Sequence, residues 1–326
     1  MPHSLPPDAT GVITIDLDAL QGNWRTLAAL VAPAECAAVV KADAYGLGAA
    51  EVIPALALAG CRTFFVATPE EGRAARLLAP EARLFALDGL FPGAAPLLLA
   101  ADVAPVLSSL EEVEEWAREA SRRGRPVPAA LQIDSGLNRL GLSANDVKTL
   151  VSRPGLLAAL DLRLVMSHLA CADDPADPHN ARQRTAFNRR RAPLSSVPAS
   201  LAASDGLMLG RAYHFDLVRP GYALYGGQAF QGGPTPVSPV VTVRARILQV
   251  RTLKTGDSVG YSATWQAKRP TRLAVVAAGY ADGIARALSA ASGKKGGVVM
   301  VAGQKAPIVG RVSMDQITVD VTDVEG

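Results

Sequence analysis

The sequence predicts an α/β protein built as a (β/α)8 TIM-type barrel followed by a β-rich domain. Short apolar, β-branched runs alternate with helical segments over roughly residues 35 to 235, and there are eight such runs. Eight successive strand–helix units are typical of this barrel. A doubly wound sheet would alternate in the same way, but no GxGxxG fingerprint follows the first strand. We therefore favour the barrel.

Each predicted barrel strand is a short, mostly apolar run. The runs cover residues 37–40, 63–66, 83–87, 103–107, 129–133, 162–166, 200–203 and 217–219. Two of the intervening helices have clear start signals: Thr68 precedes Pro69 and Glu71, and Ser109 precedes Glu112. A hydroxyl that caps the first turn, with a glutamate three residues later, is typical of a helix N-terminus.

The character of the sequence changes after a Gly- and Pro-rich stretch at residues 226–239. Runs at 240–250, 272–278, 297–301 and 317–321 are typical of strands, with turn residues and little helix between them. We expect an N-terminal strand within residues 1–17 that joins the β-domain, the barrel over 18–232, and the β-domain over 233–326.

Composition and charge exclude several classes of protein. The 33 Lys and Arg and 30 Asp and Glu residues nearly cancel, to a net charge of +3, so we expect no nucleic-acid partner. Three widely spaced cysteines without a CxxC pair argue against a disulfide framework or a metal site. The N-terminus has no signal-peptide pattern, and the most apolar stretch is interrupted by Pro and Asp. We expect a cytoplasmic protein without a membrane partner.

Candidate site residues follow from the barrel itself, because active residues lie at the carboxyl ends of its strands. Lys41 ends the first strand, where desolvation favours the neutral amine that forms Schiff bases. The later strand ends contribute Asp134 and Arg139, then His168, Ser204 and Gly206, and finally Arg219 and Gly221. Small residues after strands seven and eight can cradle a phosphate with backbone N–H groups. A lysine facing such a cradle suggests pyridoxal 5'-phosphate.

Seven ordered motifs resemble a known enzyme family. KADAYGLG, DSGLNRLG, SHLACADD, FDLVRPGYALYG, VGYSATW, GYADGIAR and GRVSMDQ are similar to successive signatures of the alanine racemases. The resemblance runs from about residue 11 to the last residue. It implies a pyridoxal-phosphate isomerase that interconverts L-alanine and D-alanine by a two-base mechanism through an external aldimine. Such an enzyme supplies D-alanine as a peptidoglycan precursor.

The resemblance also implies roles for residues of the barrel. Lys41 would hold the cofactor as an internal aldimine and act as one acid/base. His168 would lie against the pyridine ring, and Arg219 would hydrogen-bond the ring nitrogen. Arg139 would bind the phenolic oxygen of the cofactor and approach the substrate carboxylate. The phosphate would be held by Tyr45, Ser204, Gly221 and Tyr222.

Further roles are implied in the β-domain. Tyr261 would be the second base and would reach the site from the other subunit of a homodimer. The backbone N–H of Met314 would bind the substrate carboxylate. The entrance would be lined by Asp315, Tyr280 and Arg286.

Three departures from the family pattern leave alternatives open. Gln132 stands where many members carry a carbamylated lysine, so Arg139 would be held by the Gln132 amide oxygen, by a bound anion or by nothing. Ala203 stands where the family usually has Asn before the phosphate-binding serine. Related chains also continue past the point that corresponds to Gly326, so the β-domain is expected to be incomplete. The alternatives are a broad-specificity or serine racemase, a related decarboxylase, and an inactive homologue that binds the cofactor.

Overall fold

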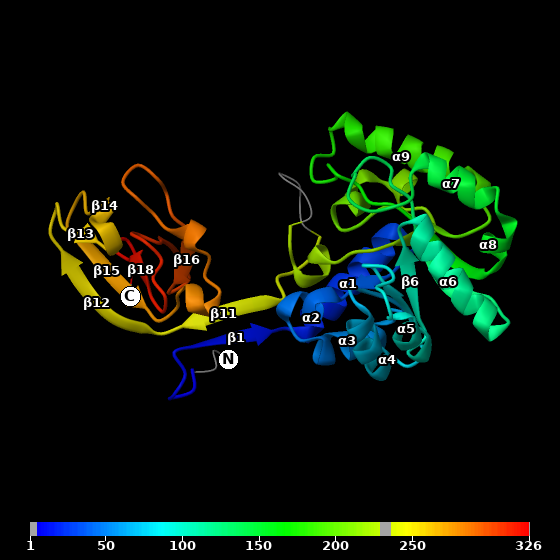
Figure 1. Ribbon diagram of the computed structural model, residues 1–326. Helices are drawn as coiled ribbons and strands as arrows, with labels where there is room; N and C mark the ends of the chain where they lie inside the picture. Colours follow the sequence, from blue (N-terminus) through cyan, green and yellow to red (C-terminus); the bar gives the residue numbers. More distant parts are fainter. Residues whose placement is uncertain (1–4, 229–235, 326) are drawn as a thin grey trace. The chain divides into compact units, whose positions relative to one another are not determined.

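The computed structural model describes residues 5–228 and 236–325, which form two compact units (Figure 1). The larger unit is Ile15–Val241, and the smaller one combines residues up to Thr14 with those from Thr242 onward. The predicted boundaries at residues 17 and 232 stay predictions, and the second of them lies outside the described residues. Within the described residues, no helix is both long and apolar enough to cross a membrane.

The larger unit contains a parallel sheet in the order β3-β4-β5-β6-β7-β8-β9. A short strand β10 pairs in parallel with β2. An isolated parallel β-bridge also joins Ala203, after β9, to Arg219, after β10, so the last strands connect back to the first and the sheet closes. The predicted TIM-type barrel is confirmed. The strands are β2 (Glu35–Cys36), β3 (Ala38–Val39), β4 (Thr63–Val66), β5 (Arg83–Ala86), β6 (Val103–Leu107), β7 (Val127–Gln132), β8 (Leu160–Met166), β9 (Ala199–Ser200) and β10 (Leu217–Val218).

Helices of this unit follow the strands along the chain. They are α1 (Leu17–Val31), α2 (Lys41–Gly46), α3 (Ala49–Ala59), α4 (Pro69–Leu78), α5 (Ala95–Ala100), α6 (Leu110–Arg123), α7 (Ala144–Val151), α8 (Pro154–Ala158) and α9 (Pro178–Arg191). Short 3-10 turns complete the unit: η1 (Ala192–Leu194), η2 (Asp205–Leu209), η3 (Arg211–Tyr213) and η4 (Tyr222–Tyr225).

The predicted helix start signals act as N-caps. The Thr68 hydroxyl accepts a hydrogen bond from the Glu71 N–H at 3.2 Å, and the Ser109 hydroxyl accepts one from the Glu112 N–H at the same distance. Helix α6 ends at Gly124, whose φ of 64° is left-handed and suits glycine.

Two apolar layers hold the barrel together, because neighbouring strand residues point to opposite faces of the sheet. Phe65 and Phe85 stack inside the barrel with ring centroids 5.0 Å apart. Phe64 belongs to the outer layer, between the sheet and the helices. Because side chains fill the inside of the barrel, we look for a ligand site in the loops at the carboxyl ends of the strands.

The smaller unit is rich in strands, as predicted. A three-stranded antiparallel sheet has the order β12-β15-β18, and three two-stranded pairs join β1 to β11, β13 to β14 and β16 to β17. The bounds are β1 (Gly11–Ile15), β11 (Val241–Ala245), β12 (Ile247–Leu253), β13 (Ser258–Val259), β14 (Trp265–Gln266), β15 (Thr271–Val276), β16 (Val298–Val301), β17 (Gln304–Pro307) and β18 (Ile317–Asp320), with 3-10 turns η5 (Tyr261–Ala263), η6 (Tyr280–Asp282) and η7 (Arg286–Leu288).

Candidate active site

A cavity of about 450 Å³ lies in the larger unit, at the carboxyl ends of the barrel strands. All eight residues that the sequence suggested for the cofactor line it: Lys41, Tyr45, Arg139, His168, Ser204, Arg219, Gly221 and Tyr222. Their roles stay predictions. The lining also includes residues that the sequence argument missed, among them Asp88 and Asp205. Asp88 directly follows the predicted strand 83–87, so the strand-end rule could have found it.

The chain turns in an unusual way directly after Lys41. Ala42, Asp43, Ala44 and Tyr45 form a left-handed turn, with φ values between 52° and 61°. This conformation costs an L-residue roughly 1–2 kcal/mol, and none of the four residues is glycine. Such strain persists only where surrounding contacts fix it, and it is concentrated at functional sites.

Hydrogen bonds from outside the turn offset this strain. The Asp43 carboxylate accepts from the Ala49 N–H at 2.7 Å, which ties the turn to the start of α3. The Glu71 carboxylate accepts from the Ala42 N–H at 2.8 Å, which ties it to α4. Lys41 and Tyr45 both line the cavity as a result.

Tyr45 is fixed against the phosphate cradle that the sequence predicted. Its ring packs on Tyr225 with centroids 4.7 Å apart, and burial raises the pKa of the Tyr45 hydroxyl. A Cβ at position 221 would overlap that hydroxyl, so only glycine fits there. The Ser204 hydroxyl accepts from the N–H groups of Gly221 and Ala223 at 3.0 and 3.1 Å. Hydroxyls and backbone N–H groups from three strand ends therefore meet in one place.

Arg219 is buried at the base of the cavity. Its guanidinium donates to the Ser200 hydroxyl and, at 2.7 Å, to the carbonyl of Ser167. Burial lowers the pKa of Arg219 to about 9, which leaves the side chain charged at pH 7. The structure thus presents a fixed cation that can donate hydrogen bonds but cannot accept them.

His168, in contrast to Arg219, carries no charge at pH 7. Burial, reinforced by the positive charges of Arg219, Arg139 and Lys41, lowers the pKa of His168 to about 3. The imidazole is therefore neutral at pH 7. Its backbone carbonyl accepts from the amide of Gln183 on α9 at 3.0 Å, so the helix holds the loop that carries this ring.

Arg139 lies on an exposed loop that is closed at its base. The Asp134 carboxylate accepts from the N–H groups of Gly136 and Asn138 at 3.1 and 3.0 Å. The buried Gln132 amide donates to the Leu140 carbonyl at 3.1 Å. Gln132 thus holds the main chain next to Arg139, and no hydrogen bond joins the two side chains within the described part of the chain.

The remaining predicted residues belong to the smaller unit. Tyr261 begins the turn η5 and is 69% exposed, and Met314 is 59% exposed. Tyr280 and Met314 lie on adjoining segments, since the Tyr280 N–H donates to Ser313 at 3.0 Å and the Ala281 N–H to Met314 at 2.8 Å. The Arg286 guanidinium lies 5.7 Å from the centroid of the Tyr280 ring. Asp315 directly follows Met314 in the sequence.

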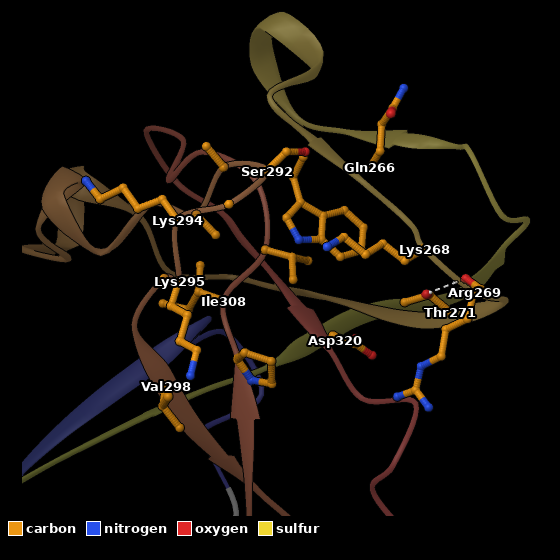
Figure 2. A pocket seen from close by; sticks show the side chains of 17 residues that line it. Gln266, Lys268, Arg269, Thr271, Ser292, Lys294, Lys295, Val298, Ile308 and Asp320 are labelled. Carbon is orange, nitrogen blue, oxygen red and sulfur yellow. Dashed lines mark hydrogen bonds between the residues drawn. The ribbon is translucent and has the colours of Figure 1, made fainter.

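Figure 2 shows a larger cavity, of about 770 Å³, in the smaller unit. Its lining includes four basic residues, Lys268, Arg269, Lys294 and Lys295, together with Asp320. The Thr271 hydroxyl donates a hydrogen bond to the Arg269 carbonyl at 2.8 Å. It contains none of the predicted site residues. In the part of the chain that the structure describes, no cluster of three His, Cys, Asp or Glu residues could hold a metal ion. The barrel cavity is therefore the candidate active site.

Comparison with known proteins agrees with this fold and site. Residues 15–229 match the model of the alanine racemase N-terminal domain, and residues 240–326 match that of the C-terminal domain. The chain is 47% identical to alanine racemase of Rhodospirillum rubrum and 49% identical to that of a Methylobacterium species. These matches cover 97% and 95% of this chain and 84% of each relative.

A crystal structure of alanine racemase from Bartonella henselae, with covalently bound pyridoxal phosphate, superposes with a TM-score of 0.89. The two sequences are 41% identical, and the match covers 98% of this chain and 88% of the other. The fold and these matches thus define an enzyme of the class that uses pyridoxal phosphate. The chain belongs to the alanine racemase family.

Proposed function

We propose that this protein interconverts L-alanine and D-alanine with pyridoxal 5'-phosphate as cofactor. The observation that carries the proposal is the barrel cavity, which brings Lys41 together with a cradle of hydroxyl and N–H donors and the buried cation Arg219. Membership of the alanine racemase family supports the same activity.

The cavity residues fit this cofactor. Lys41 would supply the amine for its aldehyde, and the phosphate would be held by Tyr45, Ser204, Gly221 and Tyr222, where glycine leaves room beside the Tyr45 hydroxyl. Arg219 would bind the ring nitrogen and His168 would lie against the ring. When bound, the cofactor withdraws electrons from the substrate and so acidifies its Cα proton. Since a guanidinium donates hydrogen bonds only, Arg219 would keep the ring nitrogen unprotonated and would limit that withdrawal.

Racemisation needs one base on each face of Cα, because the proton is removed from one side and returned on the other. We assign these roles to the Lys41 amine and the Tyr261 hydroxyl. Arg139 and the backbone N–H of Met314 hold the substrate carboxylate so that the Cα–H bond faces either base. Asp315, Tyr280 and Arg286 line the entrance.

Tyr261 acts on the barrel of the other subunit, so the active form is a homodimer with shared sites. We also place the enzyme in the cytoplasm, where its three cysteines stay reduced; Cys36, Cys61 and Cys171 are unpaired in the structure. The D-alanine that it makes would serve as a peptidoglycan precursor.

Replacement of Lys41 by Ala tests the proposal. We expect the variant to lose racemisation by at least about a thousandfold, since it removes both the anchor of the cofactor and one base. Circular-dichroism assays with each alanine enantiomer, and proton exchange at Cα in heavy water, measure the loss. Full activity of Lys41→Ala would refute the assignment, and cofactor binding without exchange in the unmodified protein would point to an inactive homologue.

A further inference from the structure

Glu71 connects two neighbouring strand ends of the barrel. It is the third residue of α4, and one carboxylate oxygen accepts from the Ala67 N–H at 2.7 Å, just before that helix. The other oxygen accepts at 2.8 Å from the N–H of Ala42, which follows Lys41 after the preceding strand β3. A single side chain thus fixes two loops: the one between β4 and α4, and the one that follows Lys41.

The bond to Ala42 falls where the backbone needs support. Ala42 is the first of the four left-handed residues, and its methyl side chain can form no hydrogen bond to support that conformation, unlike the Asp43 carboxylate. Inside the turn, the Ala44 N–H donates to the Val40 carbonyl at 2.9 Å. The Ala42 N–H is instead satisfied by Glu71, from a different element of the barrel. The direction in which the chain leaves Lys41 therefore depends on this carboxylate.

The side chain of Glu71 is itself held in place. The Thr68 hydroxyl caps its N–H, and a carboxylate in the first turn of a helix is stabilised by the helix dipole. Because both of its oxygens accept N–H groups, a glutamine of the same size could satisfy only one of them with its oxygen. The amide nitrogen would then face the second N–H, donor against donor.

We propose that Glu71 is the positioning residue for Lys41. Its carboxylate holds the left-handed turn so that the Lys41 amine and the Tyr45 hydroxyl enter the cavity together. The inference rests on the proposed function, since it assumes that Lys41 anchors pyridoxal phosphate. It adds a residue that lies outside the cavity lining and touches neither cofactor nor substrate.

Helix α6 offers a matched control. Glu112 is also the third residue of its helix, is capped by Ser109, and accepts from the Ser108 N–H at 2.6 Å. It also accepts from the backbone of Leu90, in the loop after the neighbouring strand β5. That loop carries none of the eight predicted cofactor residues. Glu112→Gln therefore breaks the same kind of bridge away from the lysine.

The experiment compares the unmodified protein with Glu71→Gln and Glu112→Gln. Each is stripped of cofactor and mixed with pyridoxal phosphate; absorption follows formation of the lysine linkage, and borohydride with mass spectrometry locates it. We expect Glu71→Gln to form the linkage about tenfold more slowly at saturating cofactor and to retain it about tenfold less tightly. Glu112→Gln should stay within about twofold of the unmodified protein, even if both variants lose thermal stability equally.

Hydrogen exchange supplies a second readout. Residues 41–49 should exchange faster in Glu71→Gln than in Glu112→Gln, because only the first variant releases the left-handed turn. Equal linkage rates and equal exchange in the two variants would overturn the role of Glu71 while leaving the proposed function intact. If the unmodified protein forms no linkage at Lys41, both the inference and the proposed function fail.

Discussion

Arg219 and His168 line the same cavity, yet their charge states differ at neutral pH. Burial lowers the pKa of both side chains. For Arg219 the pKa falls from 12.5 to about 9, so the cation survives. For His168 it falls from 6.5 to about 3, so the imidazole is neutral throughout the physiological range. The site therefore contains a positively charged hydrogen-bond donor, Arg219, and a neutral imidazole, His168, and hydrogen bonds hold both residues in place.

The lowered pKa of His168 makes a prediction about stability. Between about pH 3 and 6.5 the unfolded chain binds a proton on this residue and the folded protein does not. Stability should therefore fall as the pH drops through this window, by up to about 1.4 kcal/mol per pH unit for one proton. Urea unfolding of the unmodified protein and of His168→Gln, from pH 7 to 4, measures this contribution. A constant difference between the two proteins over that range would contradict the shifted pKa.

At the scale of elements, α9 positions the loop after β8. Gln183 is fully buried on the face of this helix that packs against the barrel. Its amide oxygen accepts from the Ala170 N–H at 2.8 Å, and its nitrogen donates to the His168 carbonyl at 3.0 Å. Arg190, about two turns further along, donates to the Asp134 carbonyl. The helix therefore holds the two loops that carry His168 and Arg139.

Replacing Gln183 by Leu should destabilise the protein by about 1–3 kcal/mol, because it removes two part-buried hydrogen bonds, from the Ala170 N–H and to the His168 carbonyl. Cofactor titration should show weaker binding as the His168 loop shifts. Asn188→Leu is the matched control, since Asn188 lies on the exposed side of the same helix and its replacement should change stability by less than about 0.5 kcal/mol. Equal effects in both variants would refute the positioning role of α9.

At the scale of the whole molecule, the proposed chemistry requires two chains. The cofactor residues belong to the larger unit, whereas Tyr261 and Met314 belong to the smaller one. If Tyr261 serves the partner's barrel, both losses fall in the same site of a mixed dimer, and the other site keeps both Lys41 and Tyr261. One intact site then forms whenever the two damaged chains pair.

Mixing Lys41→Ala chains with Tyr261→Phe chains should therefore restore activity. Random pairing at equal amounts makes half of the dimers mixed, each with one intact site, so about a quarter of the unmodified activity is expected. Racemisation after joint refolding measures it. A mixture of Lys41→Ala with the double variant is the control and should stay inactive. Inactive mixed dimers, verified by mass spectrometry, would show that each site is built from one chain.

The order of strands and helices could be predicted from the sequence because the signals are local. Alternating apolar runs, the Thr68 and Ser109 caps and the Gly124 stop depend on neighbouring residues alone. The strand-end rule likewise singled out Lys41, His168 and Arg219, since a barrel brings its strand ends together whatever the loops contain. The sequence by itself thus determined the fold class and eight of the sixteen residues that line the cavity.

The tertiary structure alone decided the properties that depend on residues far apart in the chain. The left-handed turn after Lys41 has no clear local signal, because alanine and tyrosine disfavour that conformation and part of its support comes from Glu71, in a different element. The first-turn glutamate was visible as a capping residue, but its bond to the neighbouring strand end was not. The charge of His168 depends on burial and on three cations from other strand ends. The backbone strain of the turn and the pKa of His168 are set by the residues packed around them, and these residues come together only once the chain has folded.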